Sequence, residues 1–172
     1  LPISQLGQKD RFRAGIERSG LYNKEIKRIF KQFNLPEELS VLPHVESSFQ
    51  IGAYSSAGAA GIWQFTRGTG RLFMRVGYDV DERRDPILAS YAAAKLLKKN
   101  FKSIGSWPLA ITAYNHGLQG MKRAKKRVGN DIVKVIDKYK SRTFGFASRN
   151  FYAEFLAALH VVRNQNRYFP NL

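Results

Sequence analysis

Helical spacing of apolar residues recurs along nearly the whole chain, and this repetition limits the possible folds more than any other feature. In a helix that faces a core, apolar side chains return every three or four residues. The stretch 23–33 shows this spacing, with Ile26, Ile29, Phe30 and Phe33 on one face. No segment has the convincing alternation of a strand, and no internal repeat is visible. The pattern predicts a mostly α protein.

Helix-starting residues divide this pattern into successive helices. Asn23 is placed to cap the second helix. Pro36 and the two glutamates after it suit the first turn of a third helix, which should run to about Glu46. Asp85-Pro86 and Trp107-Pro108 open later helices. Besides these, helices are expected over residues 9–19, 66–76 and 148–165, with basic amphipathic stretches at 117–127 and 130–140.

The chain has 172 residues, 44% of them hydrophobic and 13% aromatic, which suits a folded globule with a real core. We expect one domain over residues 1–172, with residues 1–34 as an N-terminal helical extension packed on the core. No apolar run approaches the length needed to span a bilayer. Because the first residue is Leu1 and no signal peptide is visible, we expect a form from which any targeting segment has been removed.

The charge is strongly positive: 29 Lys and Arg stand against 13 Asp and Glu, a net +16. Such a field attracts polyanions, and nucleic acid, anionic membrane surfaces and acidic cell-wall polymers all qualify. The chain has no cysteine, which excludes a disulfide framework and a thiolate metal site. The three histidines lack the spacing of metal ligands, so neither a metal nor a cofactor is expected.

Small residues dominate residues 51–70, where Gly52, Gly58, Gly61, Gly68 and Gly70 fall among serines and alanines. Such a composition predicts a loop in which backbone segments come close together. The loop follows directly on Glu46, the acid at the end of the third helix.

Glu46 follows an apolar run that ends at Val45, and it precedes Ser47. A carboxyl group that packs against apolar neighbours has a raised pKa, because burial disfavours its charged form. Such a group can hold a proton near neutral pH and give it to a leaving group, which is the general acid of glycosidic bond cleavage. The alternative is a helix-end glutamate in solvent.

Two amides accompany this acid. Gln64 lies between apolar residues, where an amide needs a partner. Trp63 is expected to fill the core rather than stack on a sugar. Asn115 ends an apolar helix beside Tyr114, where its carboxamide suits an N-acetyl group or an attacking hydroxyl, although a plain helix C-terminus before Gly117 gives the same pattern.

Taken in order, Glu46-Ser47, S-S-A-G-A-A-G-I-W-Q-F at 55–65 and A-Y-N at 113–115 resemble the family 1 lytic transglycosylases, which have the soluble lytic transglycosylase, or goose-lysozyme-like, domain. The flanks Q-K-D-R-F-R-A-G-I-E-R-S-G-L-Y, L-P-E-E-L and D-E-R-R-D-P resemble the membrane-bound lytic murein transglycosylase D subgroup. The similarity covers nearly the whole chain.

This resemblance implies a lysozyme-like helical domain with a substrate groove. It also implies cleavage of the MurNAc–GlcNAc β-1,4 bond of peptidoglycan with formation of 1,6-anhydro-MurNAc ends. By the resemblance, Glu46 is the single catalytic acid/base, Ser47 supports the acid or the departing sugar, and Gln64 is the glutamine of the family's motif. Tyr114 and Asn115 are the pair that lines the groove.

The chain departs from the family pattern near the start of its last helix. The family has a tyrosine after an Arg-Asn or similar pair, whereas R-N-F-Y places Phe151 in that frame and Tyr152 one residue later. Neighbouring residues point about 100° apart on a helix, so they are not interchangeable. We assign the role to Tyr152.

The acids Asp79, Asp81, Glu82 and Asp85 lie among arginines and are expected to form a solvated, salt-bridged surface.

Three other functions remain open at this point. A goose-type muramidase has the same acid but uses water, and a basic nucleic-acid-binding or non-catalytic wall-binding domain also fits the charge. The run from Lys122 to Arg127 is typical of a solvated helix face, and no nucleic-acid recognition motif is present. The expected partners are peptidoglycan glycan strands and anionic envelope polymers, bound by a monomer in the periplasm or cell envelope, or outside the cell.

Overall fold

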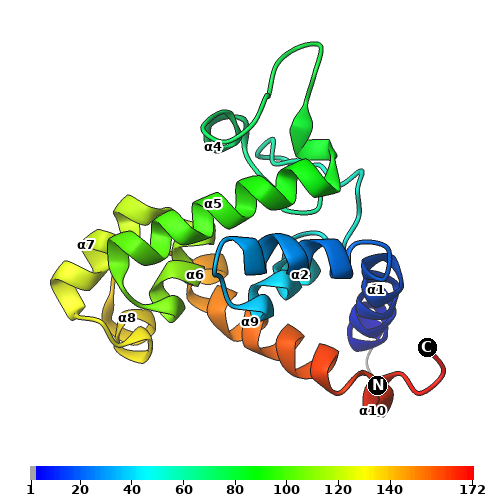
Figure 1. Cartoon of the computed structure of the whole chain (residues 1–172). Coiled ribbons are helices and arrows are strands. Elements are labelled where there is room, and N and C mark those ends of the chain that lie inside the picture. The colour runs from blue at the N-terminus through cyan, green and yellow to red at the C-terminus, as the bar shows by residue number, and fades with distance from the viewer. Residues whose placement is uncertain (1–2) are drawn as a thin grey trace. The chain divides into compact units, whose positions relative to one another are not determined.

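The computed structural model describes the backbone of residues 3–172 and the side chains of residues 8–172. Its regular secondary structure is helical, and among the described residues the β structure is limited to isolated bridges. Figure 1 shows the elements in order. They are α1 (Ile3–Ser19), α2 (Asn23–Gln32), η1 (Glu37–Val41), α3 (Leu42–Glu46), α4 (Arg67–Arg71), η2 (Glu82–Arg84), α5 (Pro86–Ile104), α6 (Trp107–His116), α7 (Leu118–Val128), α8 (Ile132–Lys138), α9 (Phe146–Arg163) and α10 (Gln165–Tyr168).

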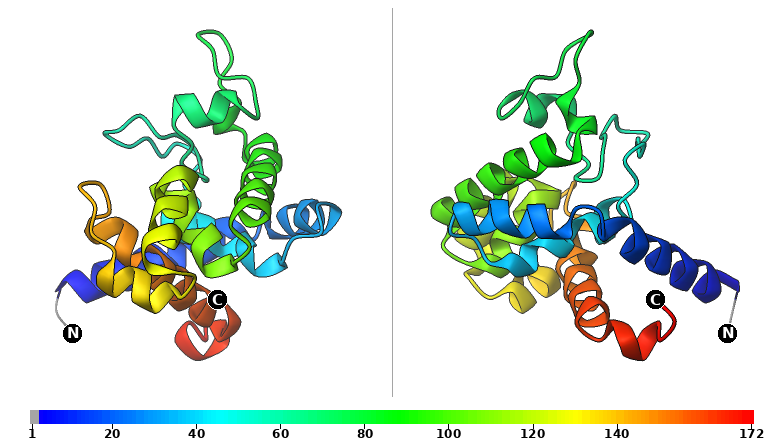
Figure 2. Two further views of the ribbon diagram at one scale, coloured as in Figure 1. Left: turned by 90° about the vertical axis from the view of Figure 1, so that its left-hand side faces the viewer. Right: turned by 45° about the vertical axis from the view of Figure 1, so that its right-hand side comes forward.

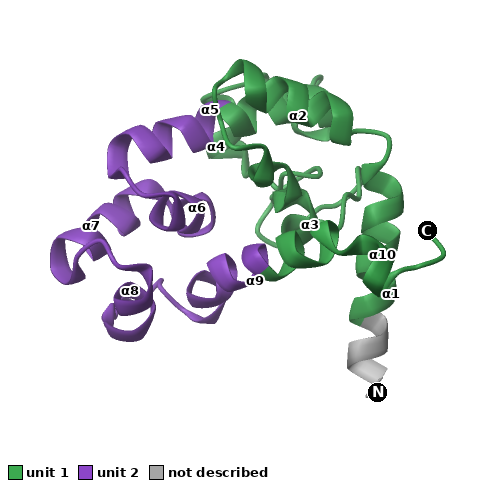
Figure 3. Cartoon of the chain, turned by 60° about the horizontal axis from the view of Figure 1, so that its bottom comes forward, with its two compact units in different colours: residues 1–94, 157–172 green, residues 95–156 purple. Residues whose placement is uncertain are grey.

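The chain forms two compact units, which Figure 3 colours separately. Unit 1 comprises residues 1–94 and 157–172, and unit 2 comprises residues 95–156. Helix α5 begins in unit 1 and ends in unit 2, whereas α9 begins in unit 2 and ends in unit 1. The expectation of a single domain over residues 1–172 stays a prediction, and residues 1–2 lie outside the described part.

The core of unit 1 forms where α2 buries its apolar face. Ile26, Ile29 and Phe30 are fully buried, and the Phe30 ring lies 5.6 Å from that of Trp63. Trp63 is itself 0% exposed, and its indole Nε1 donates to Ser90 Oγ at 2.8 Å. A buried indole needs such a partner for its N–H. The expectation that Trp63 belongs to the core is therefore confirmed.

Residues 51–66 form the predicted loop, in which isolated bridges pair Tyr54 with Ala60 and Ala60 with Phe65. Gly61 has φ +79°, and a Cβ on it would lie 1.9 Å from the carbonyl oxygen of Arg83. Only glycine permits this approach. In both views of Figure 2 the segment that follows α4 extends away from its neighbouring helices as a long loop before it reaches η2.

The core of unit 2 forms around α6, whose Leu109, Ala110 and Ala113 are buried. Met121 and Ala124 of α7 and Val135 of α8 pack in the same cluster. These are the apolar positions of the two basic stretches, and their charged positions are exposed. Amphipathic spacing alone therefore accounts for which faces α7 and α8 bury.

The helix predictions are confirmed with specific exceptions. The second helix begins at Asn23, but Asn23 does not cap it, because its Nδ2 donates to Ser19 Oγ at 3.1 Å and no side chain caps the helix. The third predicted helix is a 3₁₀ turn, η1, followed by α3. The helix expected over 66–76 is only Arg67–Arg71, capped by Thr66. The last predicted helix, 148–165, is α9 and begins two residues earlier.

Candidate functional site

Glu46 is the last residue of α3, and it is partly exposed. The helix is short, but its residues Leu42, Pro43 and His44 are buried. Helix α1 packs against α3 from the side, as the burial of Gly15 against His44 and Ser48 illustrates. The acid is therefore carried on a helix end that is anchored in the unit 1 core.

The backbone turns sharply after Glu46. Ser48 and Phe49 have φ values of 51° and 57°, in the left-handed region. For residues other than glycine this conformation costs about 1–2 kcal/mol each, so the surroundings must hold it. Arg11 Nε donates to Ser48 Oγ at 2.9 Å, and Arg18 Nη1 donates to Ser48 O at 3.0 Å. Two arginines of α1 thus fix the turn that follows the acid.

Ser47 is 2% exposed, so it is a buried residue beside the acid. Its Oγ lies 2.7 Å from the carbonyl oxygen of Ile62 and 3.3 Å from that of Pro43. A hydroxyl has one hydrogen to donate, and the shorter contact, to Ile62, is the stronger. The bond ties the end of α3 to the glycine-rich loop, so Ser47 supports the acid through the backbone.

Gln64 lies two residues beyond Ile62 and is partly buried. Its φ is 52°, and its Nε2 donates to Gly61 O at 2.9 Å and to Ala53 O at 3.3 Å. The amide expected to need a partner has two within its own loop. The Gln64 side chain therefore links the two ends of the loop, near Ala53 and Gly61. Because Ser47 donates to Ile62 of the same loop, the position of Gln64 is also fixed relative to Ser47.

Arg83 holds the same loop from its other side. Its side chain is fully buried, and Nη1 donates to Gly58 O at 2.8 Å and to Phe65 O at 2.9 Å. Nε and Nη2 donate to Asp81 Oδ1 and Oδ2 at 2.9 and 2.8 Å. Asp81 forms ion pairs, as expected, but the expectation that it lies on a solvated surface is wrong, because its side chain is only 16% exposed and neutralises a buried guanidinium. The hydrogen bonds from Arg83 hold the pKa of Asp81 below its usual value.

In unit 2, Tyr114 and Asn115 lie near the end of α6, Tyr114 partly buried and Asn115 exposed. Asn115 Oδ1 accepts a 2.9 Å hydrogen bond from the hydroxyl of Ser148, a buried residue of α9. The Ser148 oxygen also lies 3.5 Å from His116 Nδ1. With Nδ1 protonated, a chain of donors runs from His116 through Ser148 to Asn115.

His116 is a packing residue. Its ring meets Phe144 edge-on with centroids 5.0 Å apart, and a Cβ on Gly120 would lie 2.4 Å from its Nε2. Burial, and secondarily the charge of Arg123, lower the pKa of His116. The imidazole is therefore neutral at physiological pH. Among residues 8–172 no group of three or more potential ligands is placed to hold a metal ion.

The two candidates for the tyrosine position of α9 differ in accessibility. Phe151 is 2% exposed, whereas Tyr152 is partly exposed, with its ring 6.2 Å from that of Phe155. Only Tyr152 of the two presents a hydroxyl and accessible surface. Its assignment to the substrate site stays a prediction.

The structure thus divides the predicted site residues between the units. Glu46, Ser47 and Gln64 belong to one hydrogen-bonded assembly in unit 1, and Tyr114, Asn115 and Tyr152 belong to unit 2. Sequence reasoning missed the residues that hold them. The seven-residue spacing of Arg11 and Arg18 was a signal for one face of a helix, but nothing local marked Arg83 or Ser148.

Comparison with known proteins gives the class of this chain. The family model described as the transglycosylase SLT domain matches residues 25–136, more than half of the chain. The chain belongs to the transglycosylase SLT domain family, as its resemblance predicts.

Two curated proteins of one name are similar to this chain. The membrane-bound lytic murein transglycosylase D of Escherichia coli (strain K12) is 33% identical over 140 residues, which are 80% of this chain and 30% of that protein. The protein of the same name from Escherichia coli O6:H1 gives the same values. The chain therefore spans less than a third of the length of these curated relatives.

The fold also matches a solved structure. The 70 kDa soluble lytic transglycosylase SLT70 of Escherichia coli superposes with a TM-score of 0.66 at 21% identity, over 84% of this chain and 24% of that one. The expected mostly α, lysozyme-like fold is thereby confirmed.

Proposed function

We propose that this chain is the catalytic domain of a peptidoglycan lytic transglycosylase and that Glu46 is its single acid/base. The observation that carries the proposal is Glu46 at the end of α3, followed by a turn that the hydrogen bonds of Arg11, Arg18 and Ser47 hold, in a chain of the transglycosylase SLT domain family. The names of its relatives as lytic murein transglycosylases support the substrate.

The proposed reaction needs one carboxyl group in two states. Protonated Glu46 gives its proton to the bridging oxygen as the bond from the muramoyl anomeric carbon breaks. The Glu46 carboxylate then takes the proton of the C6 hydroxyl, whose oxygen bonds to the anomeric carbon. Glu46 is thereby restored, no water is consumed, and a 1,6-anhydro end forms. The substrate's N-acetyl oxygen can share the positive charge, so a second carboxylate is not required.

The other site residues have supporting parts in this proposal. Ser47 acts as a positioning residue through Ile62 rather than on the sugar, because its hydroxyl is buried. Gln64, Tyr114 and Tyr152 contribute to glycan binding. Asn115, whose amide oxygen accepts from Ser148, offers its NH₂ group to a substrate oxygen such as an N-acetyl carbonyl.

Product analysis tests the proposal. The Glu46→Gln variant keeps the shape of the side chain but has no proton to give, and we expect it to release no muropeptides from purified sacculi. The Glu37→Gln variant is a matched control, since Glu37 is exposed on η1 of the same unit. Persistent cleavage by Glu46→Gln, with both variants folded by circular dichroism, contradicts the assignment.

Mass spectrometry of the released fragments separates this proposal from the goose-type muramidase. Intramolecular closure gives anhydro ends, whereas attack by water gives reducing ends that are heavier by one water. We expect anhydro ends.

An enzyme of this kind acts where peptidoglycan is, in the periplasm or cell envelope or outside the cell, as a monomer without cofactor. No helix within residues 3–172 is long and apolar enough to cross a membrane.

A further inference from the structure

The positive charge of the chain is concentrated in unit 2. Residues 95–156 hold fourteen of the 29 Lys and Arg but only three of the 13 Asp and Glu, so they carry +11 of the net +16. The segment from α7 to the residues just after α8, 118–140, contains eight of these cations and two aspartates. This segment is therefore the region of the chain that attracts anions most strongly.

Two cations of unit 2 have structural roles. Lys125 Nζ donates to Ile104 O at 2.8 Å and ties α7 to the end of α5. The Arg149 guanidinium donates to the carbonyls of Ile136 and Tyr139 at the end of α8 and lies over the Phe144 ring. These bonds brace α7 and α8. The other cations of α7 and α8 consequently stand on helices whose positions within unit 2 are fixed.

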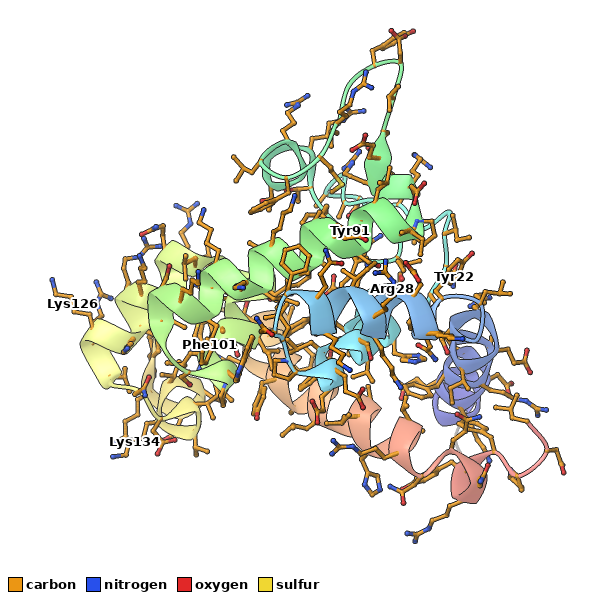
Figure 4. The ribbon with its side chains drawn as sticks, viewed as in Figure 1. Tyr22, Arg28, Tyr91, Phe101, Lys126 and Lys134 are labelled. Carbon is orange, nitrogen blue, oxygen red and sulfur yellow. The ribbon has the colours of Figure 1, made fainter. Side chains whose placement is uncertain are left out.

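Four of the remaining cations converge on one open hollow of about 610 Å³, which we call the basic depression. Its charged lining consists of Arg127, Lys134, Lys138 and Lys140. Among the residues that the structure describes, none of these four cations takes part in an ion pair. In Figure 4, Lys126 of α7 and Lys134 of α8 both point outward, away from the helices.

The composition of this surface selects among the polyanions. Helices that lie in a membrane interface insert an apolar face, but Met121 and Ala124 of α7 are buried in the protein, and Val133 is a lone exposed apolar residue on α8. Single-stranded nucleic acid needs exposed aromatic rings for stacking, but Tyr139 is only 2% exposed. The surface therefore suits discrete anionic groups on a polymer.

We propose that the basic depression binds the carboxylates of the peptide stems of peptidoglycan and so retains the enzyme on its insoluble substrate. This inference deepens the proposed function and rests on it. Each lysine or arginine offers charged donors to a carboxylate. Three of the four cations stand on α7 and α8 and Lys140 follows α8 by two residues, so together they can engage a peptide-substituted strand at several points. Binding is electrostatic and exposed, so it weakens as salt rises.

Neutralisation of three lysines tests the site. The triple variant Lys134→Gln, Lys138→Gln, Lys140→Gln removes charge from the basic depression. The matched control is Lys24→Gln, Lys27→Gln, Lys31→Gln, which removes the same charge from exposed positions of α2 in unit 1. The measurement is co-sedimentation with purified sacculi across a salt series.

We expect the depression variant to bind sacculi about tenfold more weakly, since an exposed ion pair contributes about 0.2–1 kcal/mol and three are lost. Its salt dependence should be shallower. The control should bind like the parent chain. An equal loss in both variants would mean that net charge alone retains the protein, and the proposal of a site would be wrong.

Two further measurements identify the anion that the basic depression binds. Amidation of the stem carboxylates on the sacculi should weaken binding of the parent chain to the level of the depression variant, and unchanged binding overturns the proposal. Tighter binding to anionic phospholipid vesicles or to DNA, lost in the same variant, overturns it in favour of those partners. Cleavage of soluble glycan oligomers without stems reports on the proposed active site and not on the basic depression, so inactivity there, with sacculus binding intact, contradicts the proposed function and not this site.

Discussion

The Ser47 hydroxyl donates to the Ile62 carbonyl at 2.7 Å, and this bond joins the residue after Glu46 to the loop that carries Gln64. Both partners are buried, at 2% and 1% exposure. The bond crosses fifteen residues of sequence and fixes the start of the loop against the end of α3. The acid and the glutamine consequently belong to one rigid assembly rather than to two independent segments.

Removal of this hydroxyl should harm both stability and activity. In Ser47→Ala the Ile62 carbonyl loses its donor in a buried place, which should lower the free energy of unfolding by about 1–3 kcal/mol. A small displacement of the loop should also lower kcat by about tenfold to a hundredfold. Urea denaturation and muropeptide release measure the two effects.

The exposed Ser56 of the same loop provides the matched control, and Ser56→Ala should change neither quantity. A Ser47→Ala variant with parental kcat and lowered stability would show that the bond serves the fold alone.

The buried Arg83–Asp81 pair should be among the most sensitive positions of unit 1. Asp81→Asn leaves a guanidinium with 0% side-chain exposure without its counter-charge, and breaking such a pair from one side costs about 3–5 kcal/mol. The carbonyls of Gly58 and Phe65 would then be less well held. Chemical denaturation measures the loss, and limited proteolysis within residues 51–66 reports loosening of the loop.

Arg84 is the comparison residue, since it is half-exposed and lies 3.8 Å from the same carboxylate. Arg84→Gln should cost less than about 1 kcal/mol, because surface ion pairs contribute little. Equal costs for Asp81→Asn and Arg84→Gln would contradict the view that burial makes the first pair important.

The stability of unit 1 should fall in mild acid because of His44. This residue is 7% exposed, its ring stacks on Phe12 at 4.9 Å, and its Nδ1 has no hydrogen-bond partner among residues 8–172. Burial lowers the pKa of His44 to about 4, below its ordinary 6.5. Between these values the unfolded chain binds a proton that the folded chain rejects, so stability falls as pH drops from about 6.5 to 4.

Protonation of His44 alone should lower the free energy of unfolding by up to about 3 kcal/mol, since each pKa unit corresponds to 1.36 kcal/mol. The His44→Phe variant keeps an aromatic ring between Phe12 and Phe49 and has no group to titrate. Urea denaturation at pH 7 and pH 4.5 should give a clearly smaller difference for this variant than for the parent chain. Parallel pH dependences for the two proteins would refute the role of His44.

Ser148 should govern the orientation of Asn115. Its hydroxyl holds the amide oxygen at 2.9 Å, so Ser148→Ala frees the carboxamide to rotate. If Asn115 presents its NH₂ group to substrate, kcat should fall about tenfold, an energy of about 1.4 kcal/mol. The unfolding free energy should fall by only about 1 kcal/mol, since one neutral hydrogen bond is lost.

A second variant of Ser148 shows whether its hydroxyl orients Asn115 or its side chain only fills space. Ser148→Thr keeps the hydroxyl and should recover most of the activity, whereas Ser148→Ala should not. Should the alanine variant retain full kcat on sacculi, Ser148 would have only a structural role.

The helices of this protein were predictable because their information is local. The spacing of Ile26, Ile29 and Phe30 defines the buried face of α2 without any knowledge of its partner. Asp85 was recognised next to Pro86 as a helix start, and its Oδ1 does accept from the N–H groups of Ile87 and Leu88. Asn23 does not act as the expected cap, since it is the first residue of α2 and its amide donates to Ser19 four residues earlier, while Tyr22 occupies the N-cap position without a side-chain hydrogen bond.

The sequence by itself determined the helical class, the family, and Glu46, Gln64 and Asn115 as candidate site residues, because spacing patterns and short motifs can be read from the linear sequence. Only the tertiary structure decided which polar groups are buried and with whom they pair. Arg83 and Asp81 are ordinary members of a charged stretch until folding removes the guanidinium from water. Desolvation and hydrogen-bond partnership between distant segments depend on the packed chain, and no local pattern encodes them.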